Sequence, residues 1–253
     1  TQKTKPEDSS LDVYAAIDLG SNSFRLQLAR LAGGQFYELD SIKEPVRLGA
    51  GVTSSKKLDP EAEERALACL RKFAERIRGL PDDSIRAVGT NALRVAKNSA
   101  AFVKKAEAAL GHPIAVIAGR EEARLIYLGV MTTTPSVTKR RLVIDIGGGS
   151  TEISWVSPAA VLASGLNPPI VSWGTCPIGV VTLAEDDGEP EAGDKRVWYD
   201  GLVQRLADQI ATVGAAQHLR GAFANGSGDI IGTSGTVTSL AGVFLDLPKY
   251  NRQ

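Results

Sequence analysis

Two segments of the sequence place an acidic residue before a glycine-containing turn between two apolar stretches. The first is AAIDLGSNSFRLQL, which contains Asp18, and the second is LVIDIGGGSTEISWV, which contains Asp145. Successive glycines leave backbone N–H groups unshielded and allow positive φ, which suits close approach to phosphate oxygens. A glycine hairpin can equally be no more than a tight turn. Because the pattern returns 127 residues later (145 − 18), we favour a phosphate-binding role and infer an internal duplication.

The two aspartates stand near the ends of apolar strands, where an unpartnered carboxylate is costly. Two such acids at repeated positions imply a charged ligand that they share, and a divalent cation is the simplest one. Glu152 lies two residues beyond Ser150 and points to the same side, so with Asp145 it could orient water around Mg²⁺. We therefore predict Asp18, Asp145 and Glu152 as metal-associated residues. The alternative is that Asp18 and Asp145 only cap the N–H groups of their turns.

A third acidic feature is the pair Glu121 and Glu122, which opens a predicted helix after a strand and a glycine. A helix N-terminus favours ionised carboxylates, so the pair taken alone is explained by matching of charge in the first turn. The glycine turns match neither G-x-x-x-x-G-K-[ST] nor G-x-G-x-x-G, which argues against those nucleotide-binding classes. His112 and His218 lack a second ligand at metal-binding spacing.

The periodicity of apolar residues predicts the elements that position these side chains. A helix should begin after Asp59 with Pro60 in its first turn and end at Gly79. Strands 13–20, 23–31 and 35–42 should form a meander, and the chain then alternates between strands (85–90, 114–118) and helices (99–110, 120–131). The second half should contain strands within 140–156, a proline-bearing loop, a helix over 194–213, and a strand, Gly-Ser-Gly turn and helix start within 229–244.

The polar stretch TTTPSVTK, residues 132–139, predicts a domain boundary. We expect a disordered arm over 1–12, a first domain over 13–137 and a second over 138–253. Two similar lobes that face each other would form a cleft.

Composition limits the classes of function. The 253 residues are 43% hydrophobic, and 29 Lys and Arg balance 29 Asp and Glu, so no overall charge attracts nucleic acid or anionic lipid. No stretch of about 18 apolar residues and no apolar signal sequence occurs. Cys69 and Cys176 are predicted to be reduced thiols, so we expect a cytoplasmic protein that binds neither nucleic acid nor membrane.

Five motifs together resemble the exopolyphosphatase/guanosine pentaphosphate phosphohydrolase (Ppx/GppA) family of the actin-like ATPase superfamily. They are AIDLGSNSFRL, GTNALRVAKN, AGREEARLIYLGV, LVIDIGGGSTEI and GTSGTVTSLAG, which occur in this order between about residues 14 and 251. The resemblance implies an α/β fold of two ribonuclease-H-like lobes with mixed five-stranded sheets. Because family members normally continue beyond a segment like LPKYNRQ, the second lobe is expected to be truncated at its C-terminus, and we predict weak turnover for this chain alone.

The resemblance also implies a reaction and a set of site residues. The reaction is Mg²⁺-dependent hydrolysis of the terminal phosphoanhydride of inorganic polyphosphate, or of the 5′-phosphate of guanosine pentaphosphate, in the cleft between the lobes. Glu122 matches the general base that activates water, and Glu121 is its neighbour. Asp145 and Glu152 match the Mg²⁺-associated acids. The predicted phosphate-binding residues are Ser21, Asn22, Ser23, Arg25, Arg94, Gly147, Gly148, Gly149, Ser150 and Gly235.

Several alternatives stay open at this point. Arg25 shares a strand face with Ser23, so it could contact substrate or solvent. The competing functions are an ATP-dependent phosphotransferase of the sugar-kinase type and a non-catalytic sensor of polyphosphate or guanosine tetraphosphate. The presence of Glu122 argues for the hydrolase. The resemblance further implies a role in the stringent response, regulation by guanosine tetraphosphate and a homodimeric full-length form.

Overall fold

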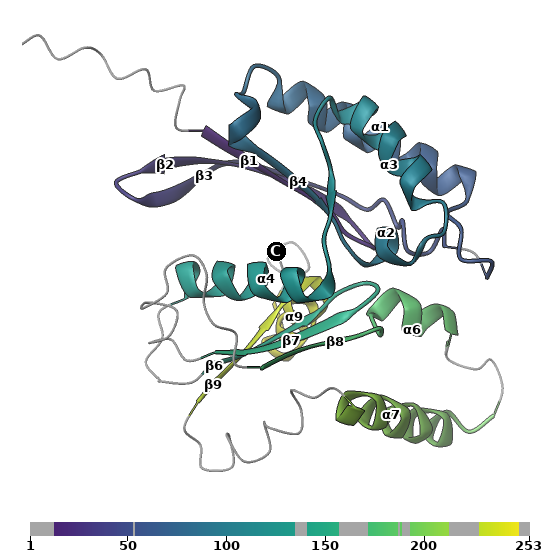
Figure 1. Cartoon of the computed structure of the whole chain (residues 1–253). Helices are drawn as coiled ribbons and strands as arrows, with labels where there is room; N and C mark the ends of the chain where they lie inside the picture. Colours follow the sequence, from purple (N-terminus) through teal and green to yellow (C-terminus); the bar gives the residue numbers. More distant parts are fainter. Residues whose placement is uncertain are drawn as a thin grey trace, which may run out of the picture. The chain divides into compact units, whose positions relative to one another are not determined.

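The computed structural model describes residues 13–52, 54–134, 141–156, 172–186, 188, 193–212 and 228–247. The predicted arm over 1–12 and most of the TTTPSVTK stretch lie outside these residues. The chain divides into two compact units, Thr1–Val116 and Ile117–Gln253 (Figure 1). We expected the boundary at 137/138, but the division precedes α4 (Gly119–Thr133), because this helix packs on the sheet of the second unit.

The first unit contains a five-stranded mixed sheet in the order β3-β2-β1-β4-β5. The three N-terminal strands pair antiparallel, as the predicted meander requires, and β1 then pairs parallel with β4. The turn between β2 and β3 uses Gly33 and Gly34 at φ of 58° and 78°. The strands are β1 (Val13–Leu19), β2 (Phe24–Ala32), β3 (Gln35–Glu44), β4 (Ile85–Gly89) and β5 (Ala115–Val116).

Helices α1 (Pro60–Ile77) and α3 (Ser99–Leu110) lie side by side over one face of this sheet (Figure 1). Asp59 caps α1 by accepting the Ala62 N–H at 2.7 Å. Their apolar faces and the covered side of the sheet form one continuous core. Two short helices complete the unit: a 3₁₀ turn (Asp82–Ser84) and α2 (Asn91–Val95), which follows β4 directly.

The second unit contains a mixed sheet in the order β8-β7-β6-β9. Here the resemblance predicts five strands, whereas the described residues form four. Strand β8 falls inside the segment that we expected to be a proline-bearing loop. The strands are β6 (Arg141–Ile146), β7 (Thr151–Val156), β8 (Ser172–Cys176) and β9 (Asp229–Thr233).

The helices of the second unit are α4, α6 (Val180–Asp186), α7 (Lys195–Thr212) and α9 (Ser234–Phe244). Tyr127 and Val130 of α4 pack against Val143 of β6, so α4 covers one face of the sheet. The apolar face predicted for α7 is only partly buried: Leu202 is 7% exposed, whereas Val197 is 68% exposed.

Candidate active site

A row of polar side chains crosses the second sheet on the face that α4 covers. Asp145 of β6 pairs directly with Glu152 of β7, and Glu152 pairs with Thr175 of β8. On the other side Asp145 pairs with Thr233 of β9, whose hydroxyl donates a hydrogen bond to Asp145 Oδ1. Directly paired residues on neighbouring strands project to the same face. The predicted Asp145 and Glu152 are therefore brought together as adjacent carboxylates.

These two carboxylates lie in a poorly solvated environment. Burial raises the pKa of Asp145, and the Thr233 hydroxyl partly opposes that shift. Glu152 is only 2% exposed. Burial, and then the charge of Glu152, raises the pKa of the neighbouring Cys176 thiol. Removing two carboxylates from water is costly unless a positive charge accompanies them.

This donor set fits Mg²⁺, which is commonly held by one or two carboxylates together with water and substrate phosphates. Among the described residues no group of three or more His, Cys, Asp or Glu side chains could hold a metal ion. The fit therefore concerns Asp145 and Glu152 as a pair. Asp18 belongs to the other unit and is considered separately below.

The glycine turn that follows β6 is held by the first residues of α6. Gly147 N–H donates to the Ser150 carbonyl at 2.9 Å and closes the turn. The carbonyls of Gly147 and Gly148 accept the N–H groups of Val180 and Val181 at 3.0 and 2.8 Å. In a trans peptide the N–H points opposite to the C=O. The N–H groups of Gly148 and Gly149 therefore point away from α6, as a phosphate cradle requires.

Gly179 makes this arrangement possible. A Cβ on Gly179 would lie 2.3 Å from the carbonyl carbon and oxygen of Gly148 and from the nitrogen of Gly149. Only a residue without a side chain lets the backbone before α6 approach the glycine turn this closely. Gly179 was not among the site residues predicted from the sequence, although a glycine directly before the apolar segment VVTLA could have indicated a close approach of the backbone.

The N-terminus of α4 carries the two predicted glutamates in different surroundings. Glu121 accepts two hydrogen bonds from Arg124, at 2.8 Å from Nε and 2.6 Å from Nη2. These bonds lower the pKa of Glu121. Glu122 N–H donates to the Ala118 carbonyl at 3.0 Å, which is the first turn of the helix. Glu121 is thus engaged as a structural ion pair and is a weakened base, which favours Glu122 for that role.

In the first unit the turn after β1 is tied to α2. The Ser21 hydroxyl accepts the Ala92 N–H at 3.2 Å, and Ser21 is 5% exposed. Arg94 lies on the same helix, so the GTNALR motif and the first glycine turn are neighbours. The segment after β3 also holds the turn, because the Arg47 and Gly49 N–H groups donate to the carbonyls of Asn22 and Ser21 at 2.8 and 2.7 Å. Direct phosphate contacts by these residues stay predictions.

The exposure of Asp18 differs from what we expected from the sequence. Its position in an apolar strand suggested a buried carboxylate, but the side chain is exposed. Ala15, Ile17 and Leu19 face the core under α1 and α3, whereas Asp18 alternates to the opposite face. Its direct partner on β2 is Arg25, which is also exposed. A metal-binding role for Asp18 is not supported by burial.

The two hairpins correspond residue by residue at the offset of 127. A Cβ on Gly20 would lie 2.8 Å from the Ser23 carbonyl oxygen, and a Cβ on Gly147 would lie 3.0 Å from that of Ser150. Asp18 pairs with Arg25 as Asp145 pairs with Glu152. The duplication inferred from the sequence is thus a duplication of backbone geometry.

Each hairpin is also held by a helix that follows the parallel fourth strand. In the first unit α2 donates to Ser21, and in the second the Ser234 hydroxyl of α9 donates to the Ile146 carbonyl. Gly235, predicted to bind phosphate, is the second residue of α9 and is exposed.

Known proteins resemble this chain over most of its length. The model of the Ppx/GppA phosphatase family matches residues 28–241. The chain belongs to the Ppx/GppA phosphatase family. An exopolyphosphatase-like protein of solved structure is 30% identical, with a TM-score of 0.78 over 93% of this chain and 70% of that one. An exopolyphosphatase from Cytophaga hutchinsonii is 25% identical, with a TM-score of 0.76 over 92% and 70%. The Aquifex aeolicus Ppx/GppA enzyme is 25% identical, with a TM-score of 0.71 over 93% and 72%.

Membership of the Ppx/GppA family confirms the resemblance seen in the motifs and the actin-like ATPase fold class, and it makes phosphoanhydride hydrolysis the class of reaction to be explained. The matched region includes Arg94, both glutamates of α4, and the Asp145 and Glu152 pair. In the described part of the chain, no helix is both long and apolar enough to cross a membrane. Cys69 and Cys176 are free thiols, as predicted.

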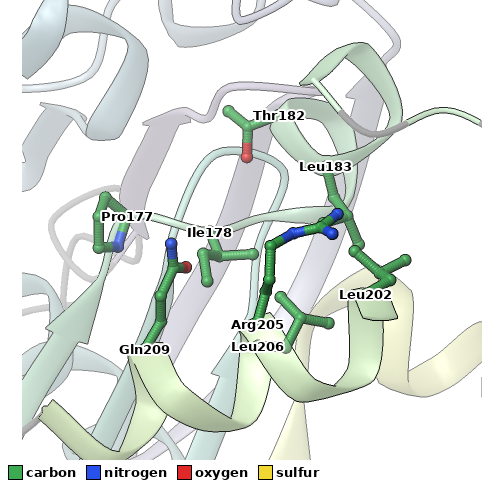
Figure 2. A pocket seen from close by; sticks show the side chains of 8 residues that line it. All are labelled: Pro177, Ile178, Thr182, Leu183, Leu202, Arg205, Leu206 and Gln209. Atoms are coloured by element: carbon green, nitrogen blue, oxygen red, sulfur yellow. The ribbon is translucent and has the colours of Figure 1, made fainter. Parts of the chain in front are cut away.

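The Ppx/GppA chain also has a pocket between α6 and α7 (Figure 2). Its walls include Leu183 of α6 and Leu202 and Leu206 of α7, with Arg205 and Gln209 extending from the same face of α7. None of the predicted site residues lines it. Because it contains no carboxylate or glycine turn, we do not assign it to the family reaction.

Proposed function

We propose that the chain hydrolyses the terminal phosphoanhydride bond of inorganic polyphosphate, the 5′-phosphate of guanosine pentaphosphate, or both. The observation that carries this proposal is the adjacent pair of poorly solvated carboxylates, Asp145 and Glu152, at the two ends of a glycine turn. A terminal phosphate, which carries up to two negative charges, is together with its cation the kind of ligand that such a pair and such a turn bind.

The proposed mechanism assigns a task to each group. The N–H groups of Gly148 and Gly149 hold the terminal phosphate and stabilise the charge on its non-bridging oxygens. Glu122 accepts a proton from the attacking water as the new P–O bond forms and the bridging P–O bond breaks, with the shortened chain leaving as the anion. Mg²⁺ bound at Asp145 and Glu152 would neutralise charge on the phosphate oxygens. Asn22, Ser23 and Arg94 are proposed as further anion contacts.

The choice of Glu122 over Glu121 rests on the Glu121–Arg124 ion pair. Loss of general-base assistance lowers turnover by roughly 10²–10⁴-fold with little change in ground-state affinity. We expect that loss in Glu122→Gln. The matched control is Glu121→Gln, for which we expect a loss below about tenfold because its carboxylate is engaged with Arg124. The opposite ranking would show that the wrong carboxylate had been chosen.

The substrate is tested by measuring phosphate release from long-chain polyphosphate, guanosine pentaphosphate and ATP side by side, with Mg²⁺ and with a chelator. Release that needs no acceptor alcohol distinguishes a hydrolase from a phosphotransferase. Guanosine tetraphosphate added as a competitor tests the proposed regulation, and light scattering of the full-length protein tests the proposed homodimer. Absence of release from all three substrates with Mg²⁺ present would contradict the proposal.

A further inference from the structure

The first residue of α4 makes an unusually close contact with the sheet below it. A Cβ on Gly119 would lie 2.4 Å from Thr175 Oγ1 and 3.1 Å from Thr175 Cβ and Cγ2. Carbon atoms do not approach an oxygen to 2.4 Å without displacement of one of them. Gly129, in the same helix, has open space at its Cβ position: beyond its chain neighbours and the backbone of its own helix, no heavy atom of the described residues lies within 4 Å. The close approach is therefore particular to the N-terminal end of α4.

This contact lies beside the carboxylate pair. Thr175 is the direct cross-strand partner of Glu152, so the point where Gly119 touches β8 is one strand away from the proposed metal-binding side chains. The Thr175 hydroxyl oxygen is buried and has no hydrogen-bond partner within the part of the chain that the structure describes. Thr175 therefore acts on α4 by steric contact and not by a hydrogen bond.

The same contact is linked to Glu122 through the backbone. Glu122 N–H donates to the carbonyl of Ala118, the residue before Gly119, at 3.0 Å. The other end of α4 is fixed separately, because Arg141 donates to the Thr134 carbonyl at 2.9 Å. Because this bond and the packing of Tyr127 and Val130 on Val143 hold the rest of α4 on the sheet, we expect a displacement at residue 119 to fall mainly on the first turn and on Glu122.

We propose that Gly119 is a positioning residue: by lying directly on Thr175, it sets the distance of the first turn of α4 from the Asp145 and Glu152 row and so places Glu122. This inference rests on the proposed function, because it assumes that Glu122 activates water. Any side chain at residue 119 would lift the first turn away from β8 and move Glu122 from its working position.

The test uses four variants, and one of them, Gly129→Ala, is the matched control. Gly119→Ala should lower kcat by roughly 10–100-fold, the loss expected when a reacting group is misplaced by about 1 Å. The value of KM for polyphosphate should change by less than about threefold, because phosphate binding is proposed to use the glycine turn. Gly129→Ala adds the same atom to the same helix in open space, so kcat should stay within about twofold.

A double variant tests whether Thr175 causes the loss of kcat in Gly119→Ala. Thr175→Ala removes the atom at 2.4 Å, and the double variant Gly119→Ala/Thr175→Ala should recover kcat to within about threefold of Thr175→Ala. If Gly119→Ala alone does not fold, a folded and active double variant supports the contact. A double variant as impaired as Gly119→Ala, or a Gly119→Ala enzyme with normal kcat, overturns the proposal.

A readout that does not need activity separates this inference from the proposed function. The carboxyl ¹³C resonance of Glu122, assigned with Glu122→Gln in glutamate-labelled protein, should move in Gly119→Ala and return in the double variant. If the parent chain hydrolyses none of the substrates but the resonance behaves in this way, the proposed function fails and the positioning contact stands. A resonance that Gly119→Ala leaves unchanged overturns the positioning contact.

Discussion

At the scale of single residues, burial and the proposed cation would act on the Asp145 carboxylate in opposite directions. Burial raises its pKa, so the folded state binds a proton more readily than the unfolded state, and stability falls as pH rises through the range between the two pKa values. Above that range the folded chain carries a buried charge at a cost, and bound Mg²⁺ would remove that cost.

We therefore predict that Asp145→Asn makes the metal-free chain more stable at pH 7, by about 1 kcal/mol, because the amide is uncharged and its oxygen still accepts from Thr233. The same variant should lose the stabilisation that Mg²⁺ gives to the parent chain. Thermal unfolding with chelator and with a Mg²⁺ series measures both effects. An Asp145→Asn chain that Mg²⁺ stabilises as much as the parent would show that the aspartate only caps a turn.

A second residue prediction concerns Glu121. Its two hydrogen bonds from Arg124 lower its pKa, so the pair stabilises the fold above the unfolded pKa of glutamate and the effect is lost as pH falls through the lowered value. Arg124→Met should bring the Glu121 pKa back toward its ordinary range. Because the pair is partly exposed, the loss of stability at pH 7 should be below about 1 kcal/mol. Carboxyl ¹³C titration of labelled protein measures the shift, and Lys105→Met, which breaks an ion pair elsewhere, should leave it unchanged.

Spacing in the sequence could predict the Asp145 and Glu152 pair because a hairpin fixes which residues of two adjacent strands meet. It could not predict Thr233 or Thr175, since their places beside these acids depend on the order and register of strands far apart in the chain. The resemblance could favour Glu122 over Glu121, but the Glu121–Arg124 ion pair needed the structure, because Arg124 three residues on can contact either the first carboxylate or solvent.

At the scale of elements, the joint between α6 and the glycine turn gives a sharp prediction. Gly179→Ala places a carbon 2.3 Å from backbone atoms of Gly148 and Gly149, and backbone cannot rotate aside as a side chain can. We expect a loss of about 1–3 kcal/mol in stability and loss of phosphate binding, measured by denaturant unfolding and equilibrium binding of polyphosphate. Gly201→Ala in α7 is the control: the added Cβ would lie 3.9 Å from the Arg205 guanidinium, an ordinary contact, so stability should not fall.

Another element prediction concerns Arg141, which joins β6 to the end of α4 and to β9. The side chain is fully buried, and besides its bond to Thr134 it forms an ion pair with Asp229 at 3.2 Å. Arg141→Met should cost about 3–5 kcal/mol because it leaves Asp229 without its cation. Adding Asp229→Asn should recover part of that loss. Urea unfolding of the single and double variants measures it, and equal losses in both would mean that the Asp229 ion pair contributes nothing.

Elements with strong local signals were predicted well. α1 begins and ends where the Asp59–Pro60 cap and Gly79 indicated, and α3 ends before Gly111, which has a φ of 76°. β8 was missed because prolines on both sides of SWGTC suggested a loop, whereas pairing with β7 makes it a strand. The short helix α2 gave no separate signal.

At the scale of the whole molecule, the described residues of the two units form cores of different size. Those of the first unit form a core of 23 buried apolar residues, whereas those of the second form two clusters of three and expose large side chains such as Phe244. We predict that amide protons of β1 and β4 exchange more slowly than those of β6 and β9, and that the second unit unfolds first. Hydrogen exchange followed by mass spectrometry measures this, and equal protection in both sheets would contradict it.

Domain organisation could be predicted only in outline. The repeated hairpin indicated two similar units, but the boundary was placed at a polar stretch, whereas packing of Tyr127 on Val143 assigns α4 to the second unit. The apolar run around Asp18 suggested a costly position for its carboxylate, and only the three-dimensional arrangement shows that α1 and α3 cover the opposite face of the strand. Such long-range packing is not encoded in local periodicity.

The constant offset between the hairpins has a practical consequence for experiments on this chain. Residues n and n + 127 share a backbone setting, so each copy can serve as an internal reference for the other. The same substitution can be compared at Gly20 and at Gly147, and the side chains of Arg25 and Glu152 can be exchanged between the two hairpins. In each comparison the effect that comes from the shared geometry of the turn is the same in both copies and drops out of the difference. The difference that remains between the two variants measures the chemistry that is particular to each copy of the inferred duplication.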